Sequence, residues 1–163
     1  MTTKELSFTI EIEGPAEVIF QLVADMPNYG RWLSDSSAFG GTIDVTPYPV
    51  RLGTTYLDAG PIEKPGVVTV FNPPTHISFR HTVQLRQPFL KTDIEAHIQY
   101  TFQQMHGKTF VDRRLGLQFN LRGIQRLLLP VILYGFRKEN DRTLASLKSY
   151  VEATVSRDSD LLE

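Results

Sequence analysis

The sequence predicts an α+β fold in which a curved antiparallel sheet of about six to seven strands packs against one long C-terminal helix. Residues 92–102 and 109–121 alternate strictly between apolar and polar side chains, as half-buried strands do. Shorter alternating segments precede them, and residues 124–155 instead carry apolar side chains at helical spacing. Because an antiparallel sheet can leave one face free to pack, we expect the helix to cover that face.

The two long alternating segments form a ribbon whose register follows from the turn between them. His106 and Gly107 suit a two-residue hairpin turn, and a slip of one residue would exchange the two faces. The expected pairs on the apolar face are Phe102–Val111, Tyr100–Arg113, Ile98–Leu115, Ala96–Leu117 and Ile94–Phe119. Those on the polar face are Thr101–Asp112, Gln99–Arg114, His97–Gly116, Glu95–Gln118 and Asp93–Asn120. Arg113 is the only charged residue on the apolar face.

The N-terminal part of the chain predicts one strand and two short helices. Residues 6–12 alternate as a first strand. Pro15 suits the start of a helix, and the apolar spacing of residues 16–26 predicts that helix, which Pro27 should end. Residues 29–33 are expected to form the second short helix.

Prolines and glycines divide the middle of the chain into four further strands. The expected strands are residues 42–46, 52–58, 67–71 and 76–85. The expected turns between them, and before the ribbon, are residues 47–49, 61–66 and 72–74 and the turn that contains Pro88.

Gly123 marks the change from strand to helix near the C-terminus. The apolar stripe of the long helix consists of Leu144, Leu147, Val151 and Val155. Pro130 and Gly135 are expected to kink or loosen its early part. We expect one domain over residues 1–155 and a polar, flexible tail over residues 156–163.

Composition excludes several classes of protein. The chain has 163 residues, 41% hydrophobic and 21% charged, which is typical of one soluble globular domain. Its net charge of −1 produces no global attraction to nucleic acid or to an anionic membrane. The absence of cysteine excludes disulfides, thiol catalysis and cysteine-bound zinc. We expect no signal peptide, no transmembrane segment and a cytoplasmic location.

Three local stretches resemble one known family. Residues 14–33 read GPAEVIFQLVADMPNYGRWL, residues 71–80 read FNPPTHISFR, and residues 142–152 read RTLASLKSYVE. Together with the element order, they resemble the polyketide cyclase/dehydrase group of the START-like (SRPBCC) superfamily. Its helix-grip fold is shared with birch-pollen-type plant allergens.

The resemblance implies a helix-grip fold with a hydrophobic cavity between the sheet and the last helix. It does not imply one activity, because the superfamily includes carriers, cyclases, hydrolases and many members of unknown role. We expect binding or carriage of a small hydrophobic or aromatic ligand, lipid- or polyketide-like. The alternatives are a polyketide cyclase, aromatase or dehydratase, and a non-catalytic quinone or lipid chaperone.

Arg113 is the first candidate for contact with the ligand. A guanidinium on an apolar face needs a partner or a route to water. It can receive the carboxylate, enolate or phenolate of a ligand, with Tyr100 across the ribbon as a second donor. Alternatively, its head reaches solvent or pairs with Asp58 at the cavity rim.

His81 interrupts an apolar strand face and is a candidate general base, because a free histidine titrates near neutral pH. The alternative is a satisfied histidine in the cavity wall. The sequence places no nucleophile or orienting carboxylate beside it. A tight turn after residue 86 would put His81 opposite Ala96, several residues along from Arg113.

The remaining ligand-binding candidates are aromatic or apolar, with one carboxylate. They are Trp32, Tyr56, Asp58, Phe79, Leu117 and Phe136. Trp32 and Tyr29 either gate the cavity or pack in the core. Asp58 either faces the cavity or caps the turn at Gly60.

Other kinds of site find no support in the sequence. His76, His97 and His106 lack the spacing of metal ligands, so we expect no metal and no cofactor. No glycine-rich phosphate loop is present. The basic residues of the last helix alternate with Glu139 and Asp141, which indicates a solvated face rather than a nucleic-acid site. The expected oligomeric state is a monomer or a homodimer.

Overall fold

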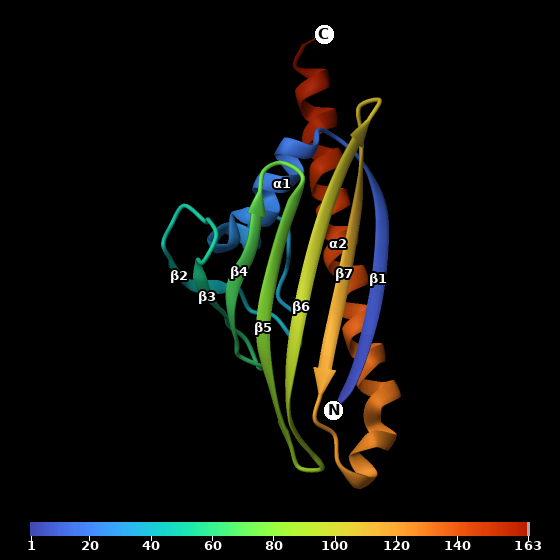
Figure 1. Cartoon of the computed structure of the whole chain (residues 1–163). Coiled ribbons are helices and arrows are strands. Elements are labelled where there is room, and N and C mark those ends of the chain that lie inside the picture. Colours follow the sequence, from blue (N-terminus) through green and yellow to red (C-terminus); the bar gives the residue numbers. More distant parts are fainter. Residues whose placement is uncertain (163) are drawn as a thin grey trace.

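The computed structural model describes residues 1–162 and has one antiparallel sheet. The strands are β1 Thr2–Glu13, β2 Thr42–Thr46, β3 Thr55–Asp58, β4 Lys64–Asn72, β5 His76–Gln87, β6 Leu90–Met105 and β7 Lys108–Phe119. The helices are α1 Ala16–Ala24, the 3-10 helices η1 Met26–Arg31 and η2 Gly123–Leu128, and α2 Leu129–Asp160. The strand order is β1-β7-β6-β5-β4-β3-β2. Figure 1 shows the long strands curving over α2, which confirms the predicted helix-grip architecture.

The predicted register of the ribbon is confirmed. β6 and β7 pair with Ile94 opposite Phe119, Tyr100 opposite Arg113 and Phe102 opposite Val111, and the other predicted pairs also hold. His106 and Gly107 both have positive φ, as the two central residues of a type I′ hairpin turn require. The apolar side chains of the ribbon are buried along its length, and near its turn Phe102 packs against Phe20 of α1.

The C-terminal half of α2 is packed tightly on the sheet. Leu144, Leu147 and Val151 are almost fully buried, as the helical stripe predicted. The helix approaches β1 so closely that a Cβ on Gly14 would lie 2.7 Å from Cγ1 of Val151. Lys148 Nζ donates to the carbonyl oxygen of Glu11 on β1 at 2.6 Å. This half of the helix anchors the fold, and the cavity must lie under the other half.

The boundaries of the middle strands differ from the prediction. β3 begins at Thr55 rather than at residue 52, because Gly53 has a φ of +84° and the chain turns there. β4 begins at Lys64 rather than at residue 67, because Lys64 pairs with Asp58 across the sheet. The segment predicted as the turn 61–66 therefore contributes three residues to the sheet, Gly66 among them.

The helix boundaries also differ. α1 ends at Ala24, and Pro27 lies in the first turn of η1 rather than ending α1. Pro130 starts α2 instead of kinking it, since the first helical turn needs no proline N–H. α2 runs to Asp160, so the predicted tail 156–163 is helical up to that residue, and Glu163 lies outside the described residues. None of the helices within residues 1–162 is long and apolar enough to cross a membrane.

Candidate functional site

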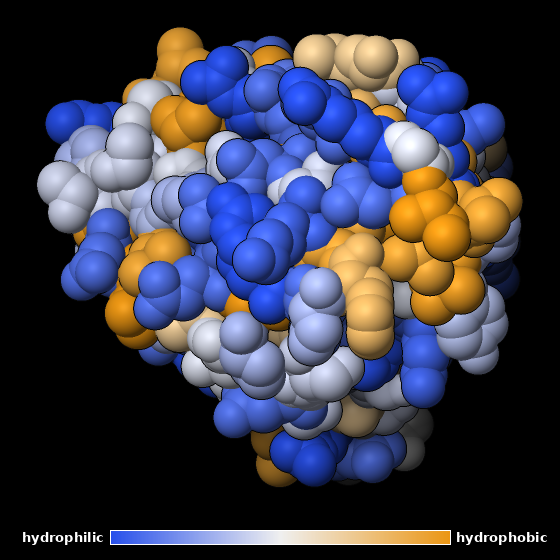
Figure 2. Space-filling model, turned by 90° about the horizontal axis from the view of Figure 1, so that it is seen from below, coloured by the Kyte–Doolittle hydropathy of each residue, from blue (hydrophilic) through white to orange (hydrophobic). Residues whose placement is uncertain are grey.

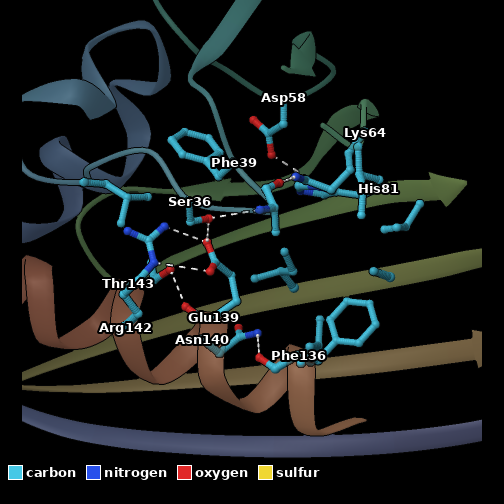
Figure 3. Close-up of a pocket in the computed structure, with 18 of the residues that line it drawn as sticks. Ser36, Phe39, Asp58, Lys64, His81, Phe136, Glu139, Asn140, Arg142 and Thr143 are labelled. Carbon is cyan, nitrogen blue, oxygen red and sulfur yellow. Dashed lines mark hydrogen bonds and ion pairs between the residues drawn. The ribbon is translucent and has the colours of Figure 1, made fainter. Parts of the chain in front are cut away.

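A cavity of about 720 Å³ lies between the sheet, the N-terminal half of α2 and the loop after η1. A volume of this size suits one small organic molecule. Most of the wall is apolar, and its larger apolar side chains are Trp32, Leu33, Phe39, Ile62, Phe79, Ile98, Leu115 and Phe136. Figure 3 shows how Phe39 and Phe136 approach the space from opposite sides.

All but one of the residues selected from the sequence line this cavity. They are Trp32, Tyr56, Asp58, Phe79, His81, Tyr100, Arg113 and Phe136. Leu117 does not line it and is fully buried in the core. Tyr29, weighed as a gate, also lines the cavity.

Arg113 and Tyr100 form a polar pair in the cavity wall. They lie opposite each other on β7 and β6, and Nη1 of Arg113 donates to the hydroxyl of Tyr100. The guanidinium carbon is 4.8 Å from the centroid of the Tyr100 ring, a cation–π distance. Arg113 is only 8% exposed, and no carboxylate within residues 1–162 forms an ion pair with it. The cation is thus buried without a counter-charge in contact.

Tyr56 and His81 meet across a glycine. Tyr56 pairs with Gly66 of β4, and Gly66 pairs with His81 of β5, so the three residues lie in one row across the sheet. A Cβ on Gly66 would lie 2.4 Å from Cζ of Tyr56, which means that the tyrosine ring lies directly over the glycine. The ring thereby spans the intervening strand, and its hydroxyl is 2.6 Å from Nε2 of His81.

Asp58 extends this row into a chain of three polar groups. Oδ2 of Asp58 is 3.5 Å from Nδ1 of His81, and Oδ1 accepts a 2.6 Å hydrogen bond from Thr42. Asp58 therefore faces the cavity, but its contacts are His81 and Thr42 rather than Arg113. Figure 3 shows the carboxylate directed at the imidazole.

Burial determines the protonation states of Tyr56 and His81. Burial lowers the pKa of His81 to about 3, with Lys64 and Arg113 acting in the same direction. Burial also raises the pKa of Tyr56 well above its ordinary value and raises the pKa of Asp58. At neutral pH His81 is therefore neutral and Tyr56 protonated, so we assign the Tyr56 hydroxyl as donor to Nε2 and place the imidazole proton on Nδ1.

A second polar cluster ties the loop after η1 to α2. Ser36 Oγ donates to Glu139 at 2.9 Å, and Arg142 donates to the same carboxylate at 2.6 Å (Figure 3). Burial would raise the pKa of Glu139, but hydrogen bonds from Arg142 and Ser36 outweigh it and lower that pKa. Lys64 Nζ donates to the carbonyl oxygen of Ala38. These contacts close one side of the cavity.

Sequence reasoning did not find this second cluster. Glu139 and Arg142 looked like part of a solvated helix face, and Lys64 was assigned to a turn. One signal could have indicated this cluster: Glu139 and Arg142 closely follow the apolar segment 127–136 on the same helix, so their charges lie next to an apolar surface.

Three buried side-chain atoms within residues 1–162 have no hydrogen-bond partner, and all three belong to residues that line the cavity. They are Nε1 of Trp32, Nε of Arg113 and Oδ1 of Asn140. Buried polar atoms are paired in most proteins, so unpaired ones concentrated at one site indicate where a polar ligand group would be accommodated. These atoms are fully buried, so a ligand could contact them only after neighbouring groups move.

The other histidines lie outside the cavity. His76 is 3.3 Å from Ser78 Oγ, and His97 is 2.8 Å from Glu95 on the polar face. Across residues 1–162, no group of three histidine or carboxylate side chains is arranged to hold a metal ion.

Comparison with known proteins gives matches in structure only. No family model matches the sequence, and no curated protein sequence matches it. The di-domain ARO/CYC protein BexL of the BE-7585A biosynthetic pathway aligns over 92% of this chain and 50% of its own, at 16% identity and a TM-score of 0.69. Ara h 8.0201 aligns over 93% of this chain and 99% of its own, at 9% identity and a TM-score of 0.70.

A START superfamily protein from Mycobacterium smegmatis aligns over 92% of this chain and 98% of its own, at 16% identity and a TM-score of 0.62. At these identities the likeness concerns the fold and not the activity. The chain shares the helix-grip fold of these three proteins, which is the fold that the resemblance predicted.

Proposed function

We propose that the protein binds a small, mostly apolar molecule with an acidic or electron-rich oxygen at one end. The observation that carries the proposal is Arg113, a buried guanidinium without a carboxylate partner, in the wall of an apolar cavity of about 720 Å³. The protein already bears the cost of desolvating this cation. A ligand oxygen that contacts it would recover part of that cost.

The two parts of the site contribute differently to binding. Burial of apolar ligand surface supplies the main driving force, roughly 25 cal/mol per Å² before the costs of association. A charge-assisted hydrogen bond to Arg113 adds about 1.5–3 kcal/mol, roughly a factor of 10 to 150 in affinity. Arg113 therefore selects which apolar molecules bind.

The structural neighbours support the chemical class. BexL is described as an ARO/CYC protein, and another neighbour as a START superfamily protein. A ligand of polyketide-like or lipid-like character, with an apolar body and a carbonyl, phenol or carboxylate, fits both the neighbours and the lining of this cavity.

A matched pair of fluorescent probes tests the proposal. 1-Anilinonaphthalene-8-sulfonate differs from N-phenyl-1-naphthylamine only by its sulfonate. The wild-type protein should bind both, with the naphthylamine displacing the sulfonate. Arg113→Met should weaken binding of the sulfonate probe by about 10- to 150-fold and leave the affinity for the naphthylamine probe nearly unchanged.

Arg114→Met is the matched control, because Arg114 lies next in sequence on the opposite, solvated face of β7. It should change neither affinity. If Arg113→Met lowered the affinity for both probes equally, or for neither, the role of Arg113 in binding the anionic group would be contradicted.

A proton-transfer enzyme is the second candidate, favoured by the Tyr56–His81–Asp58 chain. His81 would accept the phenolic proton of Tyr56 while Asp58 balances the resulting imidazolium. The pKa directions oppose this, because burial disfavours both phenolate and imidazolium. Binding is therefore the better-supported function.

Hydrogen–deuterium exchange separates the two candidates. The α-protons of 1-tetralone, an aromatic ketone, exchange slowly in neutral D₂O and can be followed by NMR. Acceleration by the wild-type protein that is lost in His81→Gln, with naphthylamine binding retained, would identify an enzyme. Binding alone predicts no acceleration by either protein.

A further inference from the structure

Large apolar side chains are exposed together at one end of the molecule. Ile124, Leu127, Val131 and Tyr134 are 67% to 79% exposed, at spacings that align them along one side of η2 and the start of α2. Phe89, in the β5–β6 turn, is 87% exposed. We call these five residues the η2 patch. Single exposed apolar residues are ordinary, but a group of them marks an interaction surface.

The two segments of the η2 patch lie at the same end of the sheet. β7 ends opposite Ile94 near the start of β6, and Thr92 Oγ1 donates to the carbonyl oxygen of Asn120 just before η2. Figure 1 shows the β5–β6 turn and η2 side by side at this end. Figure 2 looks onto it and shows hydrophobic side chains gathered on one side, bordered by hydrophilic ones.

Basic residues outnumber acidic ones around the patch. Residues 121–138 contain four basic residues and no acidic one, and Lys91 follows the β5–β6 turn. Lys91, Arg122 and Arg126 are all exposed. Arg86 is omitted from this group because it pairs with Asp93. A protein with a net charge of −1 thus has a locally positive, apolar end.

We propose that the η2 patch docks the protein onto an anionic lipid bilayer. The apolar stripe would enter the boundary between headgroups and acyl chains, and the arginines would contact the lipid phosphates. A second copy of the chain is the less suitable occupant, because two such faces would bring like charges together. The composition alone pointed away from membranes because it averages this end with the rest of the surface.

The η2 patch adjoins the cavity, so docking through the patch would bring the cavity next to the bilayer. Val131 is both exposed in the patch and part of the cavity wall, and Phe136, one and a half turns later on α2, also lines the cavity. An apolar molecule that leaves the bilayer at the patch would meet the cavity directly beside it.

Co-sedimentation of the full chain with lipid vesicles tests the proposal. The protein should bind vesicles of phosphatidylcholine with phosphatidylglycerol, bind pure phosphatidylcholine much less, and lose affinity at high salt. Leu127→Glu should weaken binding at least about tenfold. Arg122→Gln should weaken it by about fivefold, the effect of one basic residue near an anionic surface.

Matched controls come from a second exposed site. Leu52 and Arg51 lie before β3, Leu52 is 65% exposed, and Leu52→Glu and Arg51→Gln should leave vesicle binding unchanged. Naphthylamine binding should survive in all four variants, so the outcome is independent of the cavity. Failure of the wild-type protein to bind anionic vesicles at low salt would overturn the proposal. So would a solution dimer that Leu127→Glu dissociates, since a second copy would then occupy the patch.

Discussion

Replacing Gly66 with alanine tests the contact that aligns Tyr56 with His81. The φ of Gly66 is not in the positive region, so the backbone accepts alanine. The conflict is with Tyr56, because the new Cβ would lie 2.4 Å from Cζ and 2.6 Å from the hydroxyl oxygen. The ring must move by about 1 Å or more to reach ordinary contact distance, and that motion breaks the 2.6 Å hydrogen bond to His81.

The expected loss of stability follows from three contributions. Overpacking in a buried site costs about 1–3 kcal/mol. Leaving Nε2 of His81 buried without its donor costs about 1–3 kcal/mol. Replacing glycine in a strand returns about 0.5–1 kcal/mol. Gly66→Ala should therefore lower the free energy of unfolding by about 1–5 kcal/mol.

A double-mutant cycle in urea isolates this contact. In a Tyr56→Ala background the ring is absent, so Gly66→Ala should cost nothing or stabilise the protein by about 0.5–1 kcal/mol. If Gly66→Ala destabilises both backgrounds equally, the cost arises elsewhere in the sheet. The interpretation that Gly66 is needed to make room for the Tyr56 ring would then be wrong.

Three further predictions concern the cavity. Arg113→Met should leave the free energy of unfolding unchanged or raise it by about 1–4 kcal/mol, because a buried cation is replaced by an apolar group; Tyr100→Phe, which removes the acceptor of Nη1 and leaves the cation, should lower it by about 1–3 kcal/mol. A loss of stability in Arg113→Met larger than in Tyr100→Phe, measured by urea unfolding, would contradict this assignment. The free energy of unfolding should decrease as pH falls from 6.5 towards 3, by at most about 1.4 kcal/mol per pH unit, because the unfolded chain protonates His81 while the native protein, with a pKa of about 3, does not. This stability is fully present above pH 6.5. The raised pKa of Asp58 acts in the opposite direction. The pH dependence of the free energy of unfolding is therefore compared between the wild type and His81→Gln, and equal slopes in the two proteins would refute the assignment to His81. Phe136→Trp, which fills part of the cavity, should weaken naphthylamine binding about tenfold without unfolding the protein; Tyr134→Trp, exposed two residues earlier on α2, should not, and equal effects would place the probe outside the cavity.

The ribbon could be predicted from the sequence because two independent signals agree. Strict alternation assigns a face to each residue, and the His106–Gly107 turn sets the register. The contact between Arg113 and Tyr100 follows from that register alone. This part of the site was therefore accessible without a structure.

The contact between Tyr56 and His81 was not accessible in this way. It needs the registers of β3 with β4 and of β4 with β5, and the second includes an irregularity between Val68 and Val70. The turn before β4 has no alternation, so Gly66 was assigned to the turn and its role under Tyr56 was hidden. No periodic pattern shows that the missing side chain of Gly66 makes room for an aromatic ring from the neighbouring strand.

Glu139 was missed for a related reason. Its partner Ser36 lies in a loop without regular structure, and no periodicity places such a loop against α2. A carboxylate on an amphipathic helix is usually solvated, so the general rule led to the wrong surroundings for this residue.

A crystal structure of the protein with 1-anilinonaphthalene-8-sulfonate tests the central claim most directly. The account predicts the naphthalene ring between the sheet and the N-terminal half of α2, with the sulfonate within hydrogen-bonding distance of the Arg113 guanidinium. A probe bound at the outer surface, or in the cavity with its sulfonate directed away from Arg113, would contradict it.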